Sequence, residues 1–241
     1  MLGDDEVQRA LMICAHPDDV DFGAAGTVAT WTGAGVEVAY CIVTDGDAGG
    51  FDPSVPRAEI PAIRRTEQTA AAKAVGVSDV TFLGYPDGRL VATLDLRRDL
   101  AREIRRVRPQ RVLCPSPERN WQRVFASHPD HLAAGEASLA AVYPDARNPF
   151  AHPELLVDGY EPWSVPEVWM MAAPQRNRWV DITDVLMRKL DALRNHVSQH
   201  TDADGRLEER MRGWGAIVAR EAGLADGRLA EGFFAIDSAG L

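Results

Sequence analysis

Residues 10–15 read ALMICA, and the chain continues directly with the polar tetrapeptide HPDD at residues 16–19. An uninterrupted apolar run of this length is typical of a strand that is buried on both faces, as the strands of a parallel sheet are. Residues 22–33 then carry small and apolar residues at helical spacing, and residues 36–44 (VEVAYCIVT) form a second run of strand-forming residues. This succession predicts a strand, a crossover helix and a parallel strand.

The same alternation continues along the chain and decides the expected fold class. We expect further strands at residues 79–84, 111–114, 167–173 and 178–182, and helices at residues 60–75, 94–107, 131–142, 184–199 and 207–222. Strands that alternate with helices form right-handed crossovers, so we expect an α/β fold with a mostly parallel sheet flanked by helices. With 241 residues and 46% hydrophobic content, the chain is expected to form one domain over residues 1–241.

Residues 144–166 interrupt this pattern because they are rich in proline. Proline removes a backbone donor and breaks both helices and strands, so such a segment favours a long surface loop or a lid. We expect this loop to contribute to substrate specificity.

Charge and composition exclude several classes of partner. The chain carries 36 acidic and 26 basic residues, a net charge of -10, which argues against nucleic acid or an anionic membrane. No apolar stretch approaches the roughly 20 residues of a membrane span, and the first residues are acidic, unlike a signal peptide. Each of the three cysteines lies in an apolar run, so we expect buried thiols in a reducing cytoplasm. The oligomeric state is left open, with a homo-oligomer as one alternative.

Two short motifs share one composition. His16-Pro17-Asp18-Asp19 follows the first expected strand, and His128-Pro129-Asp130-His131 precedes an expected helix. Together they supply three imidazoles and three carboxylates. A catalytic zinc site uses three such ligands and leaves one position for water. Because ligands bind at the carboxyl ends of parallel strands, the two motifs predict a metal site at that edge.

His16 and Asp19 are three residues apart. In a turn or in the first turn of a helix, this spacing directs both side chains to the same point, which favours them as ligands of one metal ion. A carboxylate near the metal is then needed as a base, and Asp18 is the natural candidate, although the residues by themselves do not firmly separate it from Asp19. His128 could act as an imidazolium on the developing oxyanion, with Asp130 orienting its ring. The alternative is that H-P-D is a turn signal. Iron, manganese or cobalt tolerate the same ligands as zinc.

These residues resemble the PIG-L/LmbE-like deacetylases over most of the chain. The family motifs A-H-P-D-D and H-P-D-H are matched by residues 15–19 and 128–131. Weaker family-like stretches are Thr44-Asp45-Gly46, Arg64-x-x-Glu67, Gly84-Tyr85-Pro86-Asp87-Gly88 and His196-x-Ser198-Gln199. The resemblance implies a Rossmann-like fold, a zinc cofactor and hydrolysis of an N-acyl amino sugar.

Residue by residue, the resemblance implies the following roles. Three residues look like the zinc ligands: His16, Asp19 and His131. Asp18 looks like the general base, and His128 looks like the electrophilic or acid partner with Asp130 behind it. Arg64 and Asp87 match positions that contact the sugar in relatives.

The chain departs from the family pattern at two places. Most relatives continue A-H-P-D-D with Glu, where this chain has Val20 and then Asp21. Some sugar deacetylases carry Tyr two residues before the second motif, where this chain has Ala126. Both departures concern the surroundings of the site and leave the expected ligands unchanged.

Several other residues have a structural alternative to a functional role. Arg64 could lie on the solvated face of its helix, and Asp87 could serve only the turn signal Y-P-D-G. His196 fits a structural residue at a helix end better than a functional one. Three tryptophans could stack on a sugar, although core or loop packing is the better explanation for each of them: Trp121, Trp163 and Trp169.

The leading hypothesis is a metal-dependent hydrolase that removes an acyl group from the nitrogen of a small amino-sugar-like substrate and releases a carboxylate and a free amine. A second is an amidase or deacylase of a thiol conjugate or secondary metabolite with the same site. A third is a sugar- or nucleotide-binding module without catalysis. The chain contains no G-x-G-x-x-G or Walker motif, which counts against a nucleotide.

Overall fold

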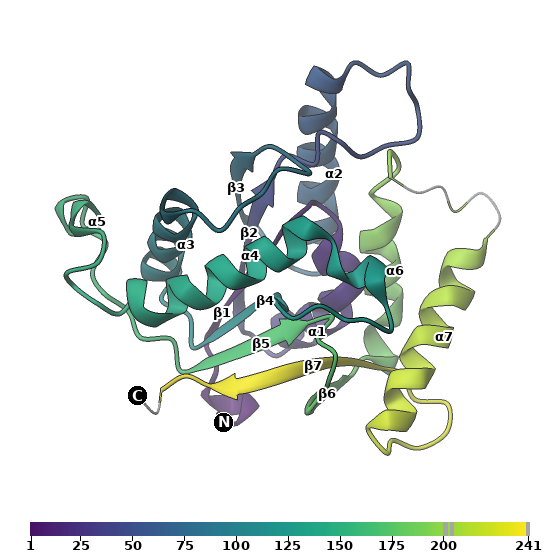
Figure 1. The fold of residues 1–241 in the computed structure, drawn as a ribbon. Coiled ribbons are helices and arrows are strands. Elements are labelled where there is room, and N and C mark those ends of the chain that lie inside the picture. The colour runs from purple at the N-terminus through teal and green to yellow at the C-terminus, as the bar shows by residue number, and fades with distance from the viewer. Residues whose placement is uncertain (200–201, 203–204, 240–241) are drawn as a thin grey trace.

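The computed structural model describes residues 1–199, 202 and 205–239. Within these residues the chain forms a seven-stranded sheet in the order β3-β2-β1-β4-β5-β7-β6 (Figure 1). The strands are β1 (Arg9–Cys14), β2 (Glu37–Thr44), β3 (Asp79–Tyr85), β4 (Arg111–Pro115), β5 (Glu167–Met171), β6 (Arg178–Asp181) and β7 (Ala230–Asp237). The five strands from β3 to β5 pair in parallel, and β7 runs antiparallel to both β5 and β6. The mostly parallel α/β sheet is therefore confirmed.

Helices cover both faces of the sheet, as predicted. On one face lie α1 (Asp19–Gly33), α2 (Ile60–Ala74) and α6 (Leu186–Arg194), and on the other α3 (Leu94–Val107) and α4 (Pro129–Ala140). Helix α7 (Arg206–Glu221) packs beside β7 and β6 at one end of the molecule (Figure 1). Helix α1 begins at Asp19, before the expected start at residue 22. The carbonyl of Asp18 already accepts from the backbone N–H groups of Asp21 and Phe22. Strand β7 was not among the expected strands.

The apolar run that opens the fold packs on both faces, which explains its composition. Side chains of a strand alternate between the two faces of the sheet. In β1, Met12 and Cys14 pack into the core with α1 and α2, while Leu11 and Ile13 pack into the core with α3 and α4. A strand with one solvated face would need polar residues at alternate positions, so its uninterrupted apolar sequence marks the centre of the sheet.

The centre of the sheet is also where the strand order reverses. From β1 the chain places β2 and β3 on one side and β4 and β5 on the other. In open parallel sheets, this reversal leaves a crevice at the carboxyl ends of the two central strands. Residues 16–19 follow β1 directly, and residues 116–128 follow β4 and lead into α4. The two H-P-D motifs are therefore brought to one crevice.

The proline-rich segment at 144–166 lies at the opposite end of the sheet. It includes a short helix, α5 (Pro153–Val157), and its Trp163 donates through Nε1 to the carbonyl of Pro109, just before β4 begins, at 2.7 Å. Figure 1 shows α5 at the far left, away from α6 and α7. The expectation that this segment contributes to specificity is wrong, because it packs at the amino ends of β4 and β5.

Two further expectations from composition can be compared with the structure. Among the described residues, no helix combines the length and the apolar character that a membrane span requires. Cys14, Cys41 and Cys114 are buried and free, as expected from their apolar surroundings.

Candidate metal centre

Three predicted ligands converge at the carboxyl end of β1. His16 Nδ1 lies 3.2 Å from His131 Nε2 and 3.4 Å from Asp19 Oδ2, and His131 Nε2 lies 3.0 Å from Asp19 Oδ1. Two donor atoms that each lie about 2.0–2.1 Å from a tetrahedral zinc ion are separated by about 3.3 Å. The separations between the three side chains therefore fit one shared cation, and their ligand atoms lie within 4.8 Å of one another.

Hydrogen bonds orient both imidazole rings for this purpose. His16 Nε2 lies 3.1 Å from Asp87 Oδ1 and 3.3 Å from Asp130 Oδ2, so it carries the proton and leaves Nδ1 free to bind a metal. His131 Nδ1 donates to the carbonyl of Ala126 at 3.3 Å, which leaves Nε2 free in the same way. Such outer hydrogen bonds fix the tautomer of a metal-binding histidine.

The electrostatics favour a positive charge at the same point. Burial raises the pKa of Asp19, but the rings of His131 and His16 outweigh burial and hold it well below its usual value. Burial likewise opposes the charged form of His16, yet Asp19, Asp130 and Asp87 together raise its pKa to about 12. A site whose carboxylates hold a proton this firmly can hold a divalent cation there instead. The donor set therefore fits a metal.

A second set of donors shares His16 but is less well arranged. His16, Asp87 and His128 also bring three ligand atoms within 4.8 Å. This set would use His16 Nε2, which already faces the carboxylates of Asp87 and Asp130. Asp87 additionally accepts from the backbone N–H of Ala48 at 3.3 Å. The set that includes Asp19 is therefore the better arranged of the two for a metal.

Asp18 lies beside these ligands with a different electrostatic environment. Burial raises the pKa of Asp18 to about 7, with the Arg64 guanidinium opposing this shift and the Asp19 carboxylate adding to it. Its Oδ2 lies 3.2 Å from Arg64 Nη2. A carboxyl group that titrates near neutrality can both accept and return a proton. The two neighbouring aspartates therefore have distinct environments, which the sequence could not establish.

His128 completes the site but in a form that differs from the expected one. Its ring lies edge-on to His16, with ring centroids 4.9 Å apart. Burial and the neighbouring His16 charge lower the pKa of His128, which favours the neutral ring over the expected imidazolium. His128 Nδ1 accepts from the backbone N–H of Asp130 at 3.2 Å, so the neutral ring carries its proton on Nε2.

The carboxylate of Asp130 has a different partner from the expected one. It lies 3.3 Å from His16 Nε2 and accepts from the backbone N–H groups of Gly88 at 2.7 Å and Leu90 at 3.2 Å. Asp130 therefore orients the ring of His16, whereas we expected it behind His128. The prediction was wrong because sequence distance favoured the nearer histidine.

The two residues expected to contact the sugar are both buried. Arg64 is only 2% exposed, so the alternative of a solvated helix face is wrong. Its guanidinium donates to the carbonyls of Pro17 and Gly46 and pairs with Asp18. Asp87 is 8% exposed and faces His16, so it has a partner beyond its turn. Both side chains support the metal-binding turn.

Sequence reasoning missed a buried group behind Asp18. Gln68 of α2 accepts from the backbone N–H of Asp18 at 2.7 Å and donates to Asp21 Oδ2 at 2.9 Å. Asp21 Oδ2 also lies 2.8 Å from His196 Nε2. Gln68 lies one helical turn after Arg64 and so shares its helix face, but this spacing by itself does not distinguish a functional glutamine in the sequence.

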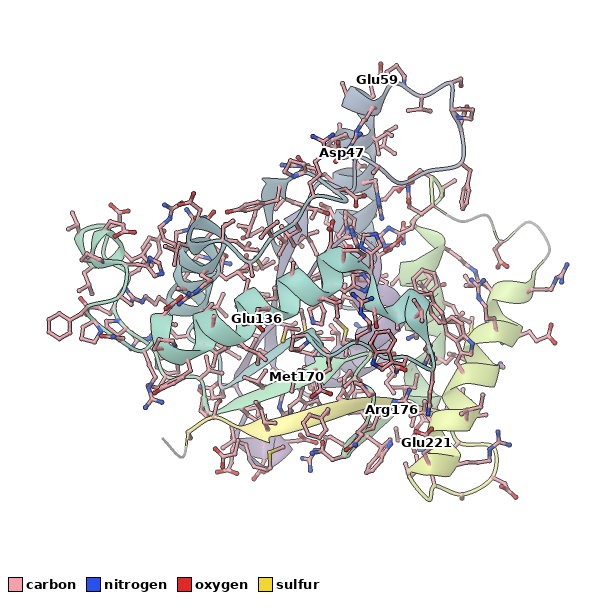
Figure 2. The ribbon with its side chains drawn as sticks, viewed as in Figure 1. Asp47, Glu59, Glu136, Met170, Arg176 and Glu221 are labelled. Atoms are coloured by element: carbon pink, nitrogen blue, oxygen red, sulfur yellow. The ribbon has the colours of Figure 1, made fainter. Side chains whose placement is uncertain are left out.

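A groove of about 870 Å³ extends from the metal centre toward α7. Asp19 and His131 are among its lining residues, together with Phe125, Met171 and Trp214. Figure 2 shows Arg176 and Glu221 close together at this end of the molecule, where they form an ion pair of 2.6 Å. The groove is therefore built by residues 120–126, residues 171–176 and α7.

The tryptophans expected to stack on a sugar are placed elsewhere. Trp169 is buried in the core, Trp163 packs at the amino end of the sheet, and Trp121 is 80% exposed. Among the described residues that line the groove, the tryptophan is Trp214. The signal for Trp214 was absent from the sequence, because α7 reaches the groove only through tertiary packing.

Two diacetylchitobiose deacetylases are similar to this chain over most of its length. The diacetylchitobiose deacetylase of Thermococcus kodakarensis is 34% identical over 194 residues, which cover 80% of this chain and 71% of that protein. The structure of the N,N'-diacetylchitobiose deacetylase from Pyrococcus horikoshii, in complex with its inhibitor MPG, matches with a TM-score of 0.88 at 31% identity. The match covers 97% of this chain and 85% of that chain.

A protein described as an enzyme of another reaction class has a similar fold. GalB, the 4-carboxy-2-hydroxymuconate hydratase from Pseudomonas putida, matches with a TM-score of 0.76 at 23% identity, over 95% of this chain and 96% of that chain. Because one fold hosts different reactions, activity has to be argued from the site. The family model described as PIG-L, GlcNAc-PI de-N-acetylase, matches residues 11–142, more than half of the chain and both H-P-D motifs. This chain belongs to the PIG-L family of de-N-acetylases.

Proposed function

We propose that this protein is a metal-dependent N-deacetylase that hydrolyses the acetamide of an amino sugar and releases acetate and a free amine. The observation that carries this proposal is the convergence of His16, Asp19 and His131 on one point, with the carboxyl group of Asp18 beside them. Relatives at more than 30% identity include two diacetylchitobiose deacetylases and a probable N-acetyl-α-D-glucosaminyl L-malate deacetylase, which supports the same reaction class.

We propose zinc as the metal, held by His16, Asp19 and His131. Two imidazoles and one carboxylate are a common ligand set for catalytic zinc, and other divalent metals accept the same donors. The bound metal would supply Lewis-acid activation of water and of the amide carbonyl. Asp87 and Asp130 would keep the ring of His16 in the required tautomer.

The side chains around the metal then divide the proton transfers. Asp18 removes a proton from the attacking water, since its pKa near 7 makes the unprotonated form available at neutral pH. His128 Nε2–H donates to the oxygen that becomes negative in the tetrahedral transition state. Asp18 returns its proton to the leaving nitrogen as the C–N bond breaks. Water thus adds to the acetyl carbon, and the products are acetate and the amine.

The groove supports a substrate larger than a single sugar. Ligand pockets commonly enclose roughly 300–1,000 Å³, and this groove of about 870 Å³ lies toward the upper end of that range. With the acetamide at His131, the rest of the molecule would extend toward Trp214, whose ring lies 5.7 Å from the guanidinium of Arg210. We propose that a second sugar or another attached group occupies this part.

The test is deacetylation of N,N'-diacetylchitobiose and N-acetylglucosamine by protein loaded with zinc, with release of acetate as the readout. We expect Asp18→Asn to retain stoichiometric metal while kcat falls by at least about 100-fold, because a general base contributes roughly 10²–10⁴. The exposed carboxylate of Asp226 provides a matched control, and Asp226→Asn should behave as the unaltered protein. Near-normal turnover of the Asp18 variant would contradict its role as the base.

We propose two further properties of the protein as a whole. A reducing cytoplasm is supported by the three buried free cysteines. A single catalytic domain over residues 1–241 is supported by one continuous sheet order that runs from β3 to β6.

A further inference from the structure

Asp18 has an unusual backbone conformation at the start of α1. Its φ of 90° and ψ of -23° lie in the left-handed region, which costs a residue with a Cβ about 1–2 kcal/mol. Its carbonyl accepts from Asp21 and Phe22 within the helix, while its N–H points away from the helix. The conformation therefore needs support from outside α1.

Helix α2 supplies this support through Gln68, whose side chain is fully buried. Its Oε1 accepts the N–H of Asp18 at 2.7 Å. The backbone of Asp18, the proposed general base, is thus fixed by a residue of a different helix. A buried N–H that loses its partner costs about 1–3 kcal/mol. The contact thus stabilises one conformation of Asp18 over the alternatives.

The direction of the Gln68 amide is itself determined by Asp21. A carboxylate accepts hydrogen bonds and does not donate them, so Asp21 Oδ2 requires the NH₂ end of Gln68, which lies 2.9 Å away. The oxygen of the amide then has to face Asp18. Asp21 is held in turn by His196 Nε2 at 2.8 Å. Asp21, the residue after the family departure at Val20, therefore joins Gln68 and His196 in one buried chain of hydrogen bonds.

Arg64 holds the side chain of the same residue. One turn before Gln68 on α2, its Nη2 lies 3.2 Å from Asp18 Oδ2 and donates to the carbonyl of Pro17. The metal ligands have other anchors, since Asp19 accepts the backbone N–H of His16 at 2.8 Å and His131 donates to Ala126. The side chains of the ligands therefore keep anchors that do not involve Gln68, whereas the backbone of Asp18 depends on it.

We propose that Gln68 is a positioning residue of the deacetylase: it holds Asp18 in its left-handed conformation and thereby aims the base, without affecting metal binding. This inference rests on the proposed function, because it assigns Gln68 an effect only through the catalytic carboxylate of Asp18. A displacement of about 1 Å in a catalytic group can lower the rate about 100-fold.

The experiment is a double-mutant cycle with Gln68→Met and Asp18→Asn, measured with zinc-loaded protein and N,N'-diacetylchitobiose. We expect Gln68→Met alone to lower kcat about 10- to 100-fold, with KM and zinc stoichiometry unchanged. In the Asp18→Asn background the same substitution should change the residual kcat by less than about twofold, because residues that act as one unit are not additive. Thr66→Ala, on an exposed part of α2, is the matched control.

The outcomes separate the inference from the proposed function. If Asp18→Asn retains normal turnover, the proposed role of Asp18 fails. If Asp18→Asn loses turnover while Gln68→Met does not, or if Gln68→Met lowers kcat equally in both backgrounds, only the inference about Gln68 is overturned. Should Gln68→Met unfold, Gln68→Ala enters the same cycle. Loss of zinc in both variants would overturn the inference, since Gln68 would then support the metal site as a whole.

Discussion

The two ends of the sheet use buried polar side chains in opposite ways. At the amino end, Arg105 of α3 donates to the carbonyls of residues 145, 146, 148, 151 and 160, and so holds the proline-rich segment in one conformation. At the carboxyl end, three ligand atoms face one point, and Asp18 is held in a left-handed conformation beside them. Satisfied donors and acceptors indicate a structural role, whereas ligand atoms that converge on one point indicate a site.

We expect the largest difference between the two ends when a histidine at each end is replaced and zinc affinity is measured. His131→Ala removes a metal ligand, so we expect zinc affinity to fall by more than the roughly 10- to 100-fold that loss of an outer hydrogen-bond partner costs, with loss of deacetylation. His152, which lies 3.5 Å from Asp145 at the amino end, is the control. Titration with a zinc chelator measures both variants, and equal zinc affinities would break the comparison.

Asp130 provides the next largest expected effect, since it lies in the carboxyl-end network without being a ligand. Asp130→Asn leaves the acceptor for Gly88 or Leu90 but weakens the contact with His16 Nε2. We expect zinc affinity to fall about 10- to 100-fold. The matched control is Asp145→Asn at the amino end, whose carboxylate pairs with Arg97. If Asp130→Asn binds zinc as tightly as the unaltered protein, its orienting role is excluded.

Arg105 tests the other side of the comparison. Arg105→Met removes the donor of the buried carbonyl of Asp145 and of several half-buried carbonyls, and an unpaired buried carbonyl costs about 1–3 kcal/mol. We expect the free energy of unfolding to fall by about 2–4 kcal/mol, while zinc stoichiometry and KM stay unchanged. Urea denaturation measures this loss, with Arg102→Met on the more exposed side of α3 as the control. A large change in KM would show that the proline-rich segment communicates with the site after all.

The smallest expected effect concerns the groove. Trp214→Ala removes an aromatic wall residue and should raise KM for N,N'-diacetylchitobiose about two- to tenfold, as the loss of about 0.5–1.5 kcal/mol of aromatic contact would. N-acetylglucosamine should be less affected, because it does not reach α7. Phe150→Ala, an exposed aromatic residue in the proline-rich segment, should change neither KM. Steady-state kinetics measure KM for both substrates. A larger rise in KM for N-acetylglucosamine than for N,N'-diacetylchitobiose would contradict this role of Trp214.

Several features of the fold were predictable because they depend on local patterns. The buried run of β1 and the crossover helix α1 followed from apolar spacing alone, and the two H-P-D motifs were recognisable by composition. Strand β7 was missed, and the proline-rich segment was assigned to specificity. Both errors concern where an element packs, which proline content and apolar spacing do not encode.

The site was predictable in its members but not in its contacts. Which carboxylate faces His16, and which nitrogen of each ring remains free, depends on atoms brought together from residues more than a hundred positions apart. Gln68 was overlooked because a buried glutamine on a helix has no distinctive pattern until its partner Asp18 is placed beside it.

The amino-acid sequence by itself determined the alternation of strands and helices, the acidic character of the chain and the identity of the residues able to bind a metal. These properties depend on neighbours along the chain. Only the tertiary structure decided that Asp130 serves His16, that Arg64 and Gln68 hold Asp18, and that α7 forms the groove wall. Such contacts are set by distances of about 3 Å between separate elements, and hydrogen bonds and metal ligation require that precision.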